Sequence, residues 1–486
     1  MHKKLVLNVV SRILLVVCLS MVLPLGWAFV EDYSSTETRA FLVAMLGGFV
    51  FTFLVRKFFP VSMDEMEELN AKDGLAIVGL SWIFISVFGA VPFFLSGAVP
   101  SYTDAFFETA SGFTTTGATV ITRIEALPRG ILFWRSLTHW LGGMGIIVLS
   151  VALLPALGRG AYQLYRAEAP GPTAERVRPK MKETAKTLWM VYFILSFAET
   201  VLLMAGGMPL FDAMCHTFGT MATGGFSTKN ASIAAYGPYI QWVIIGFMLM
   251  AGANFQLHYQ ALRGQVRSYT RSEEFRTYLL LILTCVPVFT AILYLTSGSL
   301  GEEVLRTAAF QVVSILTTTG YTTADFNLWP AFLKVVLVIL MFIGGCAGST
   351  GGGMKVIRVW VALKSGYRSV RQALLPNAVM HVKIDAKPVS DSYVLMATTY
   401  FLIYVSLFGL GTVFMTLSES TDLVTAFAAS VACLSNIGPG LGEVGAVENY
   451  AWISIPGKWL LSFLMLAGRL ELYSILVLLL PSTWRK

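Results

Sequence analysis

Long apolar stretches alternate with short polar ones from one end of the chain to the other. A helix needs about 20 apolar residues to cross a bilayer, and each long stretch reaches that length. The pattern predicts ten membrane-spanning helices, at approximately residues 5–30, 38–58, 74–99, 130–157, 187–207, 238–261, 278–297, 330–361, 393–417 and 459–480. We therefore expect an all-α integral membrane protein.

Four shorter, half-polar inserts lie within this pattern. They fall between the third and fourth spans, the fifth and sixth, the seventh and eighth, and the ninth and tenth. Aligned without gaps, they read DAFFETASGFTTTGAT, DAMCHTFGTMATGGFS, TAAFQVVSILTTTGYT and TAFAASVACLSNIGPG. The inserts begin at Asp104, Asp212, Thr307 and Thr425, and a glycine follows 13 residues later, at Gly117, Gly225, Gly320 and Gly438. Repetition at one fixed spacing predicts a repeated structural unit.

Each insert has the pattern of a half-membrane helix followed by a non-helical loop. The Asp or Thr at its start is typical of a helix N-cap, and the next apolar residues predict a helix about half a bilayer long. Non-helical backbone at membrane depth is tolerated only where it is packed in protein or lines water. Four helix C-termini directed at one cavity would favour a cation there, and glycines would let backbone carbonyls replace its hydration shell.

This interpretation predicts a pore with a cation filter made by four re-entrant loops. The second loop offers both Gly224 and Gly225, and the repeat spacing selects Gly225 as the equivalent glycine. The alternative is that these small residues only allow close helix packing, but four copies at one spacing favour the filter. The candidate filter residues are Thr115, Thr116, Gly117, Thr223, Gly224, Gly225, Thr318, Thr319, Gly320, Asn436, Ile437 and Gly438.

The span that follows each insert carries a pair of small residues near its middle. The pairs are Gly142-Gly143, Ala251-Gly252, Gly344-Gly345 and Ala467-Gly468. Close packing of inner helices explains three of them, but in the third span glycine dominates as far as Gly353, which predicts a broken helix in mid-membrane. The broken segment contains Gly344, Gly345, Gly348, Ser349, Thr350, Gly351, Gly352 and Gly353.

In these features the chain resembles the Trk/Ktr/HKT superfamily of potassium transporters. The shared motifs are the four span–pore-helix–span units, the TTTG, TGGF, TTTGY and SNIGPG loops, the broken third inner helix and the inner-helix arginine Arg469. The resemblance covers essentially the whole chain, and two extra N-terminal spans are typical of one bacterial type. It implies an N-terminal two-helix unit at 1–70 and pore repeats at 71–158, 184–265, 276–365 and 390–486.

The resemblance also implies a function and partners. It implies potassium uptake across a bacterial cytoplasmic membrane, with potassium bound at the filter residues, and a gate made by the broken segment together with Arg469. It further implies a homodimer with one pore per protomer and a cytosolic nucleotide-binding regulatory subunit of the RCK type. A sodium- or proton-coupled cation symporter of the same fold is the alternative, and the residues leave passive and coupled flux both open.

The distribution of charge adds the expected orientation of the chain in the membrane. The net charge is +7, and the basic residues gather in every second loop, on the side where both termini fall. The positive-inside rule therefore predicts cytoplasmic termini and gives the basic residues a role other than nucleic-acid binding. Two broad basic loops, 159–186 and 355–387, are candidates for docking a regulator. The first apolar stretch is too long for a signal peptide and is expected to be a retained span in contact with lipid.

A few polar residues at membrane depth are further candidates. Arg469 lies in mid-span, where a charge is usually functional, and an ion pair with Glu471 is disfavoured because residues two apart on a helix point in different directions. Glu199 is either a proton or ion site or a partner of a pore-helix polar group. His139 is expected to pack the inner helix rather than bind metal.

Three other polar residues lie in or beside the inserts. Glu108 and His216 occupy matching positions in the first two inserts and are expected to form hydrogen bonds within the scaffold. Asp325 follows the third loop, where a carboxylate would gather cations at the outer mouth.

Two other classes of membrane protein fit less well. A secondary transporter with broken helices usually has two inverted repeats, whereas this chain has four repeats in one orientation. A membrane enzyme would need a catalytic cluster, and the chain contains no HExxH, no GxSxG and no metal-spaced Cys/His set. We therefore expect no enzymatic activity and no organic cofactor in this chain.

Overall fold

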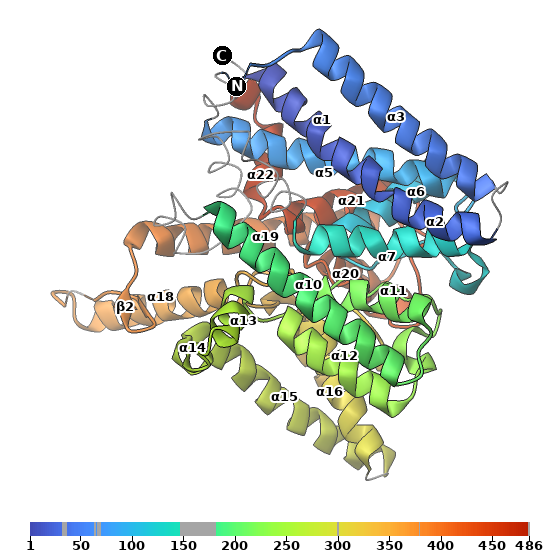
Figure 1. Cartoon of the computed structure of the whole chain (residues 1–486). Coiled ribbons are helices and arrows are strands. Elements are labelled where there is room, and N and C mark those ends of the chain that lie inside the picture. The colour runs from blue at the N-terminus through green and yellow to red at the C-terminus, as the bar shows by residue number, and fades with distance from the viewer. Residues whose placement is uncertain are drawn as a thin grey trace.

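The fold is a ring of helical repeats with extra helices on one side. The computed structural model describes residues 1–31, 36–62, 65, 70–145, 181–298, 301–378 and 380–484, and it is almost wholly helical (Figure 1). The N-terminal helices α1 (Lys3–Ser20) and α3 (Thr36–Phe58) pack on α5, and α2 (Val22–Glu31) packs on α7. This N-terminal unit therefore lies outside the first repeat.

Four repeats follow, each with an outer helix, a short pore helix and an inner helix. The first contains α5 (Ala71–Leu95), α6 (Tyr102–Phe113) and α7 (Arg129–Gly143), and the second α10 (Met181–Ala205), α11 (Leu210–Met221), α12 (Pro238–Ala251) and α13 (Phe255–Leu262). The third contains α15 (Glu273–Ser297), α16 (Glu302–Leu316), α17 (Ala331–Ile343) and α18 (Val356–Leu374). The fourth contains α19 (Asp391–Ser418), α20 (Leu423–Leu434), α21 (Ile455–Arg469) and α22 (Tyr473–Leu479).

Short elements complete the repeats. A 3₁₀ helix follows each filter loop, at η1 (Ile124–Ala126), η5 (Ser232–Ala235), η6 (Phe326–Leu328) and η7 (Gly442–Val444). The remaining elements are α14 (Arg267–Arg271), α23 (Pro481–Trp484) and a small antiparallel hairpin of β1 (Lys383–Ile384) and β2 (Lys387–Pro388), in which Lys383 pairs with Pro388.

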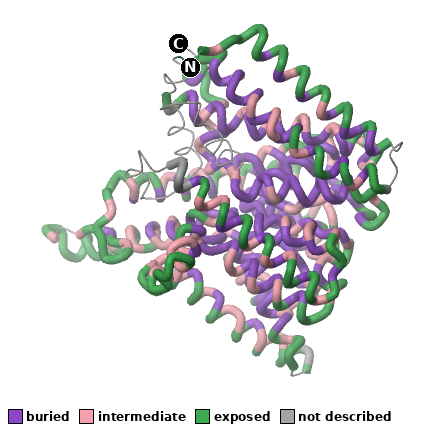
Figure 2. The backbone as a smooth tube through the Cα atoms, in the orientation of Figure 1, coloured by how far each residue is buried: buried purple, intermediate pink, exposed green. Residues whose placement is uncertain are grey.

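The repeats close into a ring through one contact used four times. Each inner helix packs on the pore helix of the next repeat: α7 on α11, α12 on α16, α17 on α20, and α21 back on α6. Buried residues gather at the centre of this ring, whereas peripheral helices such as α3 and α15 carry exposed residues at intervals along their length (Figure 2). Exposed apolar side chains on the outer helices include Phe53, Phe197, Leu283 and Leu410, which suits a lipid environment.

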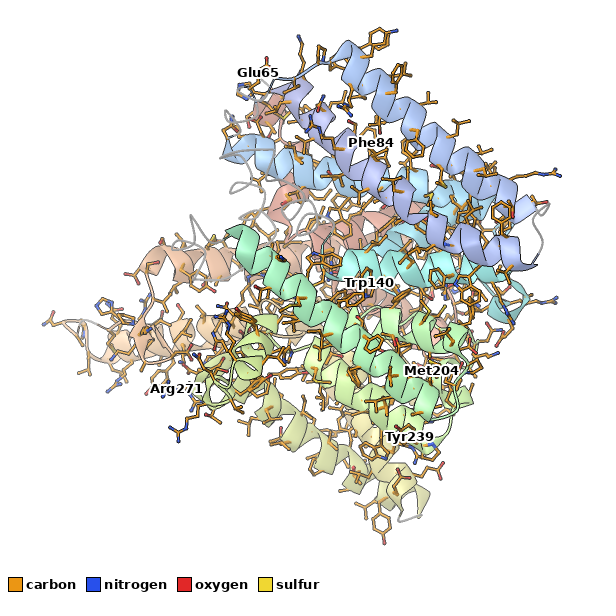
Figure 3. All side chains as sticks on the ribbon, viewed as in Figure 1. Glu65, Phe84, Trp140, Met204, Tyr239 and Arg271 are labelled. Carbon is orange, nitrogen blue, oxygen red and sulfur yellow. The ribbon has the colours of Figure 1, made fainter. Side chains whose placement is uncertain are left out.

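The outer helix α10 also covers the contact between the first two repeats. Trp140 of α7 lies at the centre of the view, beside α10 (Figure 3), and its indole N–H donates to Ser196 Oγ at 3.1 Å. The Tyr192 hydroxyl of α10 donates to the Trp140 carbonyl at 3.1 Å. These bonds fix an outer helix to the inner helix of a different repeat.

In the described residues, six helices are long and apolar enough to cross a membrane, or up to seven if α12 and α13 form one bent span. These include the expected N-terminal spans and all four outer helices. The inner helices fall short because each ends or bends near its small pair, so the full count of ten spans stays a prediction. The second half of the span predicted at 130–157 lies outside the described residues.

The predicted starts of the pore helices are wrong by one turn or more. The N-caps are Ser101, Pro209, Gly301 and Asp422. Asp104, Asp212 and Thr425 lie in the first turn instead, and Thr307 lies inside α16, which has an additional turn at its start. The sequence misled because acidic side chains in a first turn favour the helix N-terminus as a cap does.

Breaks in the inner helices are more general than the sequence indicated. The third helix breaks between Ile343 and Val356, as predicted. The second bends by 100° between α12 and α13, and the fourth breaks between Arg469 and Tyr473. Two of the small pairs lie where the inner helix meets the end of its own pore helix: a Cβ on Gly142 would overlap the Phe113 carbonyl, and one on Gly468 the Leu434 carbonyl.

Candidate ion filter and intramembrane loop

The four pore helices end in the same hydrogen-bonded turn. A residue with left-handed backbone follows each helix: Thr115 (φ 53°), Thr223 (φ 55°), Thr318 (φ 61°) and Asn436 (φ 56°). The next N–H then donates back to a carbonyl five residues earlier, in Thr116 to Ser111 (2.9 Å), Gly224 to Gly219 (2.7 Å), Thr319 to Ser314 (2.8 Å) and Ile437 to Ala432 (2.9 Å). Such a turn usually uses glycine, so four non-glycine residues there indicate a backbone held by its surroundings.

The four predicted glycines form a ring. Gly117, Gly225, Gly320 and Gly438 have φ values of 82°, 81°, 79° and 93°. A Cβ on each would come within 3.0 Å of a carbonyl oxygen of the next loop: that of Gly224, Thr319, Ile437 and Thr116, respectively. The ring fits only glycine at these positions, for backbone conformation and for space.

This geometry confirms the register taken from the repeat spacing. Gly225, not Gly224, has the left-handed backbone of the other three filter glycines. Gly224 instead lies against the His139 ring, which a Cβ would overlap. The structure thus brings all twelve candidate filter residues to one layer, while ion binding by them stays a prediction.

Hydrogen bonds join each pair of neighbouring loops, and they are of three kinds. A backbone N–H donates to an asparagine side chain between the first and second loops, Ile124 to Asn230 Oδ1 (3.1 Å), and between the third and fourth loops, Gly442 to Asn327 Oδ1 (3.0 Å). Between the second and third loops, the Tyr321 hydroxyl donates to the Phe226 carbonyl (3.2 Å). Between the fourth and first loops, the Asn436 side-chain amide donates to Thr116 Oγ1 (3.0 Å). The ring therefore has a common backbone and joints that are not all alike.

The broken segment of the third inner helix lies directly against the filter. The Gly352 N–H donates to Thr318 Oγ1 at 2.5 Å, and the Gly353 N–H donates to the Ser435 carbonyl at 3.0 Å. The Thr350 hydroxyl donates to the Met221 carbonyl at the end of α11, at 2.9 Å. The segment Gly344–Lys355, called here the intramembrane loop, thus contacts the second, third and fourth repeats beneath their filter loops.

Arg469 links this loop to the first repeat. Its guanidinium donates to the Thr350 carbonyl at 2.6 Å and to the Gly142 and Gly143 carbonyls at 2.8 and 3.0 Å. The predicted contact between Arg469 and the loop is therefore present. Glu471 forms an ion pair with Arg358 of α18 instead, in agreement with the argument from spacing.

Two features of this region were missed in the sequence. Glu274, in the first turn of α15, accepts the N–H groups of Ala347 (2.7 Å) and Ile357 (3.2 Å) and so holds both ends of the intramembrane loop. Glu471 and Leu472 have φ values of 57° and 58°, which breaks the fourth inner helix. Neither carried a signal, because Glu274 resembles an ordinary helix-start acid and no glycine marks the second break.

The other singled-out side chains serve the scaffold. His216 contacts Ser227 Oγ at 2.9 Å, and Glu108 accepts the Val120 N–H at 3.0 Å, so both bond within the scaffold as predicted. His139 stacks on the Phe226 ring, with centroids 4.1 Å apart. Asp325 caps η6 by accepting the Asn327 N–H at 2.9 Å, and its expected role in gathering cations stays a prediction.

Glu199 is the exception among the polar candidates. It is fully buried in α10, and neither carboxyl oxygen has a hydrogen bond of good geometry to a described residue. Thr220 of the pore helix α11 is nevertheless a side-chain neighbour of this carboxyl, which agrees with one of its two expected roles, and the choice between that role and a proton or ion site stays open.

Comparison with known proteins places this geometry in a family. A family model described as TrkH, a cation transport protein, matches residues 42–485. The chain is 40% identical over 495 residues to the Trk system potassium uptake protein TrkH of Salmonella typhimurium, with 100% of both chains covered. It is 35% identical over 427 residues to the Trk system potassium uptake protein TrkG of Escherichia coli K12, covering 86% of each.

A solved structure agrees with the computed one. The crystal structure of the potassium transporter TrkH from Vibrio parahaemolyticus superposes with a TM-score of 0.87 at 36% sequence identity, and the match covers 100% of both chains. The family model, the Salmonella relative and the solved structure match most or all of the chain, including the four filter loops and the intramembrane loop. The chain belongs to the TrkH family of cation transport proteins.

Proposed function

We propose that this chain takes up potassium across the cytoplasmic membrane of a bacterium, through a filter made by its four non-identical pore loops. The observation that carries the proposal is the ring of Gly117, Gly225, Gly320 and Gly438, each facing a carbonyl of the next loop. Rings of backbone carbonyls select potassium by replacing its hydration shell. The relatives' printed names, which specify potassium uptake, support the same ion.

In this proposal the intramembrane loop and Arg469 form the gate. The loop lies under the filter and is held there by hydrogen bonds to Thr318 and Ser435. The Arg469 guanidinium adds a positive charge at the same depth, which raises the barrier for a cation. Release of the loop would remove the obstruction, while displacement of Arg469 would remove the repulsion.

We also propose that the gate is controlled from the cytoplasm. The region 355–387 carries exposed basic residues, among them Arg371, Lys383 and Lys387, on a helix and hairpin outside the ring. It would dock a cytosolic nucleotide-binding subunit of the RCK type, with both termini on the same side and the chain assembled as a homodimer. The other proposed docking loop, 159–186, lies largely outside the described residues.

Tracer flux into proteoliposomes tests the filter. Purified chain is reconstituted, and rubidium-86 uptake is measured with potassium or sodium as competitor, with and without sodium and pH gradients. We expect uptake that potassium inhibits far better than sodium, and we expect Gly320→Ser to admit about tenfold more sodium relative to potassium, because its side chain enters the carbonyl ring. Unchanged ion preference in all four single-glycine variants would refute the filter, and uptake that requires a sodium or proton gradient would favour the symporter.

A pull-down tests the partner. Tagged chain is solubilised from its native membrane, and co-purifying soluble proteins are identified, with a variant carrying Arg371→Glu, Lys383→Glu and Lys387→Glu as control. We expect a nucleotide-binding protein with the parent chain and much less of it with the charge-reversed variant. Absence of any such protein from the parent sample would count against the proposed regulator.

A further inference from the structure

A buried ion pair lies behind the first two filter loops. Glu108 of α6 and Arg135 of α7 have 0% and 2% exposed side chains, and Arg135 Nε lies 2.6 Å from Glu108 Oε1. In the other ion pairs of the described residues, at least one partner is more exposed than either of these. Burial of two charges costs several kcal/mol per ion before pairing, so a pair at this position needs a specific role.

The carboxylate of Glu108 holds the exit from the first filter loop. Its Oε1 accepts the Thr119 hydroxyl at 2.9 Å, and its Oε2 accepts the Val120 N–H at 3.0 Å. Both donors follow Gly117 by two or three residues. With the Arg135 contact, each oxygen of the carboxylate is occupied, and the strand that leaves the first loop is fixed to its own pore helix.

The guanidinium of Arg135 extends this brace to the second loop. Its Nη1 donates to the Ser227 carbonyl at 3.0 Å, and its central carbon lies 3.5 Å from the centre of the Phe226 ring. One turn further along α7, His139 Nε2 accepts the Phe226 N–H at 3.2 Å. One inner helix therefore grips the residues immediately after Gly225 and, through Glu108, those immediately after Gly117.

The equivalent position in the other pore helices is not charged. His216 contacts Ser227 Oγ at 2.9 Å, the Gln311 side-chain oxygen accepts the Thr323 N–H at 2.7 Å, and Ala429 has no polar side chain. In three of the four repeats, the side chain at this pore-helix position therefore holds the segment that follows the filter glycine of the same repeat. The side chain is a carboxylate, an imidazole and an amide, respectively. Among the described residues, only the first repeat makes this brace an ion pair.

We infer that Glu108 and Arg135 are positioning residues for ion selection, which rests on the filter proposed above. The pair sets the spacing between the carbonyls of the first and second loops. It does so with no net charge, because the carboxylate offsets a guanidinium that would otherwise repel cations from the path. Loss of the carbonyl spacing or of the charge compensation should alter ion preference or affinity. Loss of a purely structural pair would alter only the amount of folded protein.

Two single variants separate charge from geometry. Glu108→Gln keeps the shape and leaves Arg135 uncompensated, so the rubidium concentration for half-maximal flux should rise about tenfold. Arg135→Lys keeps the charge but lacks the fork that reaches both Glu108 and Ser227, so sodium flux relative to potassium should rise about tenfold. Both quantities are normalised to the chain recovered in proteoliposomes.

A milder variant and a control complete the experiment. Thr119→Val removes one hydrogen bond of the brace and should raise relative sodium flux about threefold, and it decides the matter if the charge variants do not fold. Glu302→Gln neutralises the partner of Arg306 at the outer start of α16, where Glu302 is 54% exposed, and should change neither quantity.

The outcomes distinguish this inference from the filter itself. If the folded variants at Glu108, Arg135 and Thr119 keep parental ion preference and half-saturation, or lose only maximal flux, the pair is scaffold and the inference is wrong. Gly320→Ser is measured in parallel. A changed preference in Gly320→Ser alone would leave the filter standing, whereas unchanged preference there as well would overturn the filter assignment.

Discussion

The filter layer and the layer directly beneath it are built on opposite plans. In the filter, four sequences as different as TTTG and SNIG adopt one backbone, with glycine φ values between 79° and 93°. Beneath it, three inner helices are interrupted and differ from one another: one bends by 100°, one has a 12-residue intramembrane loop at 344–355, and one breaks at two non-glycine residues.

The comparison indicates which part of the molecule needs four-fold symmetry, the backbone of the filter layer, and which part does not, the inner helices beneath it. A cation on the axis is held equally only if all four walls offer carbonyls at one level, so side chains vary and backbone does not. In the proposed gate, one element moves against three that remain, which agrees with a loop carried by a single repeat. Variants of the lower layer should therefore change how much ion passes, and variants of the upper layer should change which ion passes.

The largest effect is expected from shortening the intramembrane loop. Deletion of residues 348–351 removes Thr350, with its bond to Met221, and displaces the N–H groups that bond Thr318 and Ser435. Several lost hydrogen bonds of about 1 kcal/mol each should raise flux without a regulator by tenfold or more. Rubidium flux in proteoliposomes measures it, with the potassium-to-sodium ratio as control. Parental flux from a folded deletion variant would show that this loop is not the gate.

Replacement of Arg469 should act in the same direction with a smaller effect. Arg469→Ala removes the positive charge and the bonds to Thr350, Gly142 and Gly143, yet the loop remains in place. We expect flux to rise about fivefold, and Arg469→Lys, which keeps the charge but not the fork, to lie between parent and alanine variant. A lysine variant equal to alanine would mean that geometry, not charge, closes the path.

A matched pair of threonines tests the link between the two layers. Thr318 and Thr115 hold equivalent positions, with φ values of 61° and 53°, but only the Thr318 hydroxyl accepts from the intramembrane loop. The Thr115 hydroxyl has no hydrogen-bond partner in the described residues. Basal rubidium flux in Thr318→Val should exceed that in Thr115→Val about threefold, the effect of one lost bond. Equal flux would indicate that the layers are not coupled there.

The smallest effect is expected at Glu199. This buried carboxyl lies on α10, with no described bond to a filter residue or to the intramembrane loop. Glu199→Gln keeps the shape and should leave flux within about twofold of the parent, at every pH between 6 and 8, because a scaffold position does not follow the ion. A lost or shifted pH dependence would instead identify Glu199 as a coupling site.

The sequence predicted the shared backbone of the four loops well because its cause is local, while ion binding there stays a prediction. A fixed spacing from helix to glycine determines where the chain turns, and the choice of Gly225 over Gly224 followed from that spacing alone. Helix starts were predicted poorly, since Asp104 and Asp212 suit a first turn as well as a cap. The contacts of Glu274, Arg135 and Glu471 could not be predicted, because each depends on segments distant in sequence.

The bond between Asn436 and Thr116 spans 320 residues and has a consequence for biosynthesis. The first three filter loops can be synthesised and inserted while the fourth wall is still missing. Until α20 and α21 are inserted, the first pore helix lacks the neighbour that α21 supplies. Contacts so distant in sequence form late in synthesis. In the proposed pore, insertion of the C-terminal repeat is therefore the step that supplies the fourth wall of the filter.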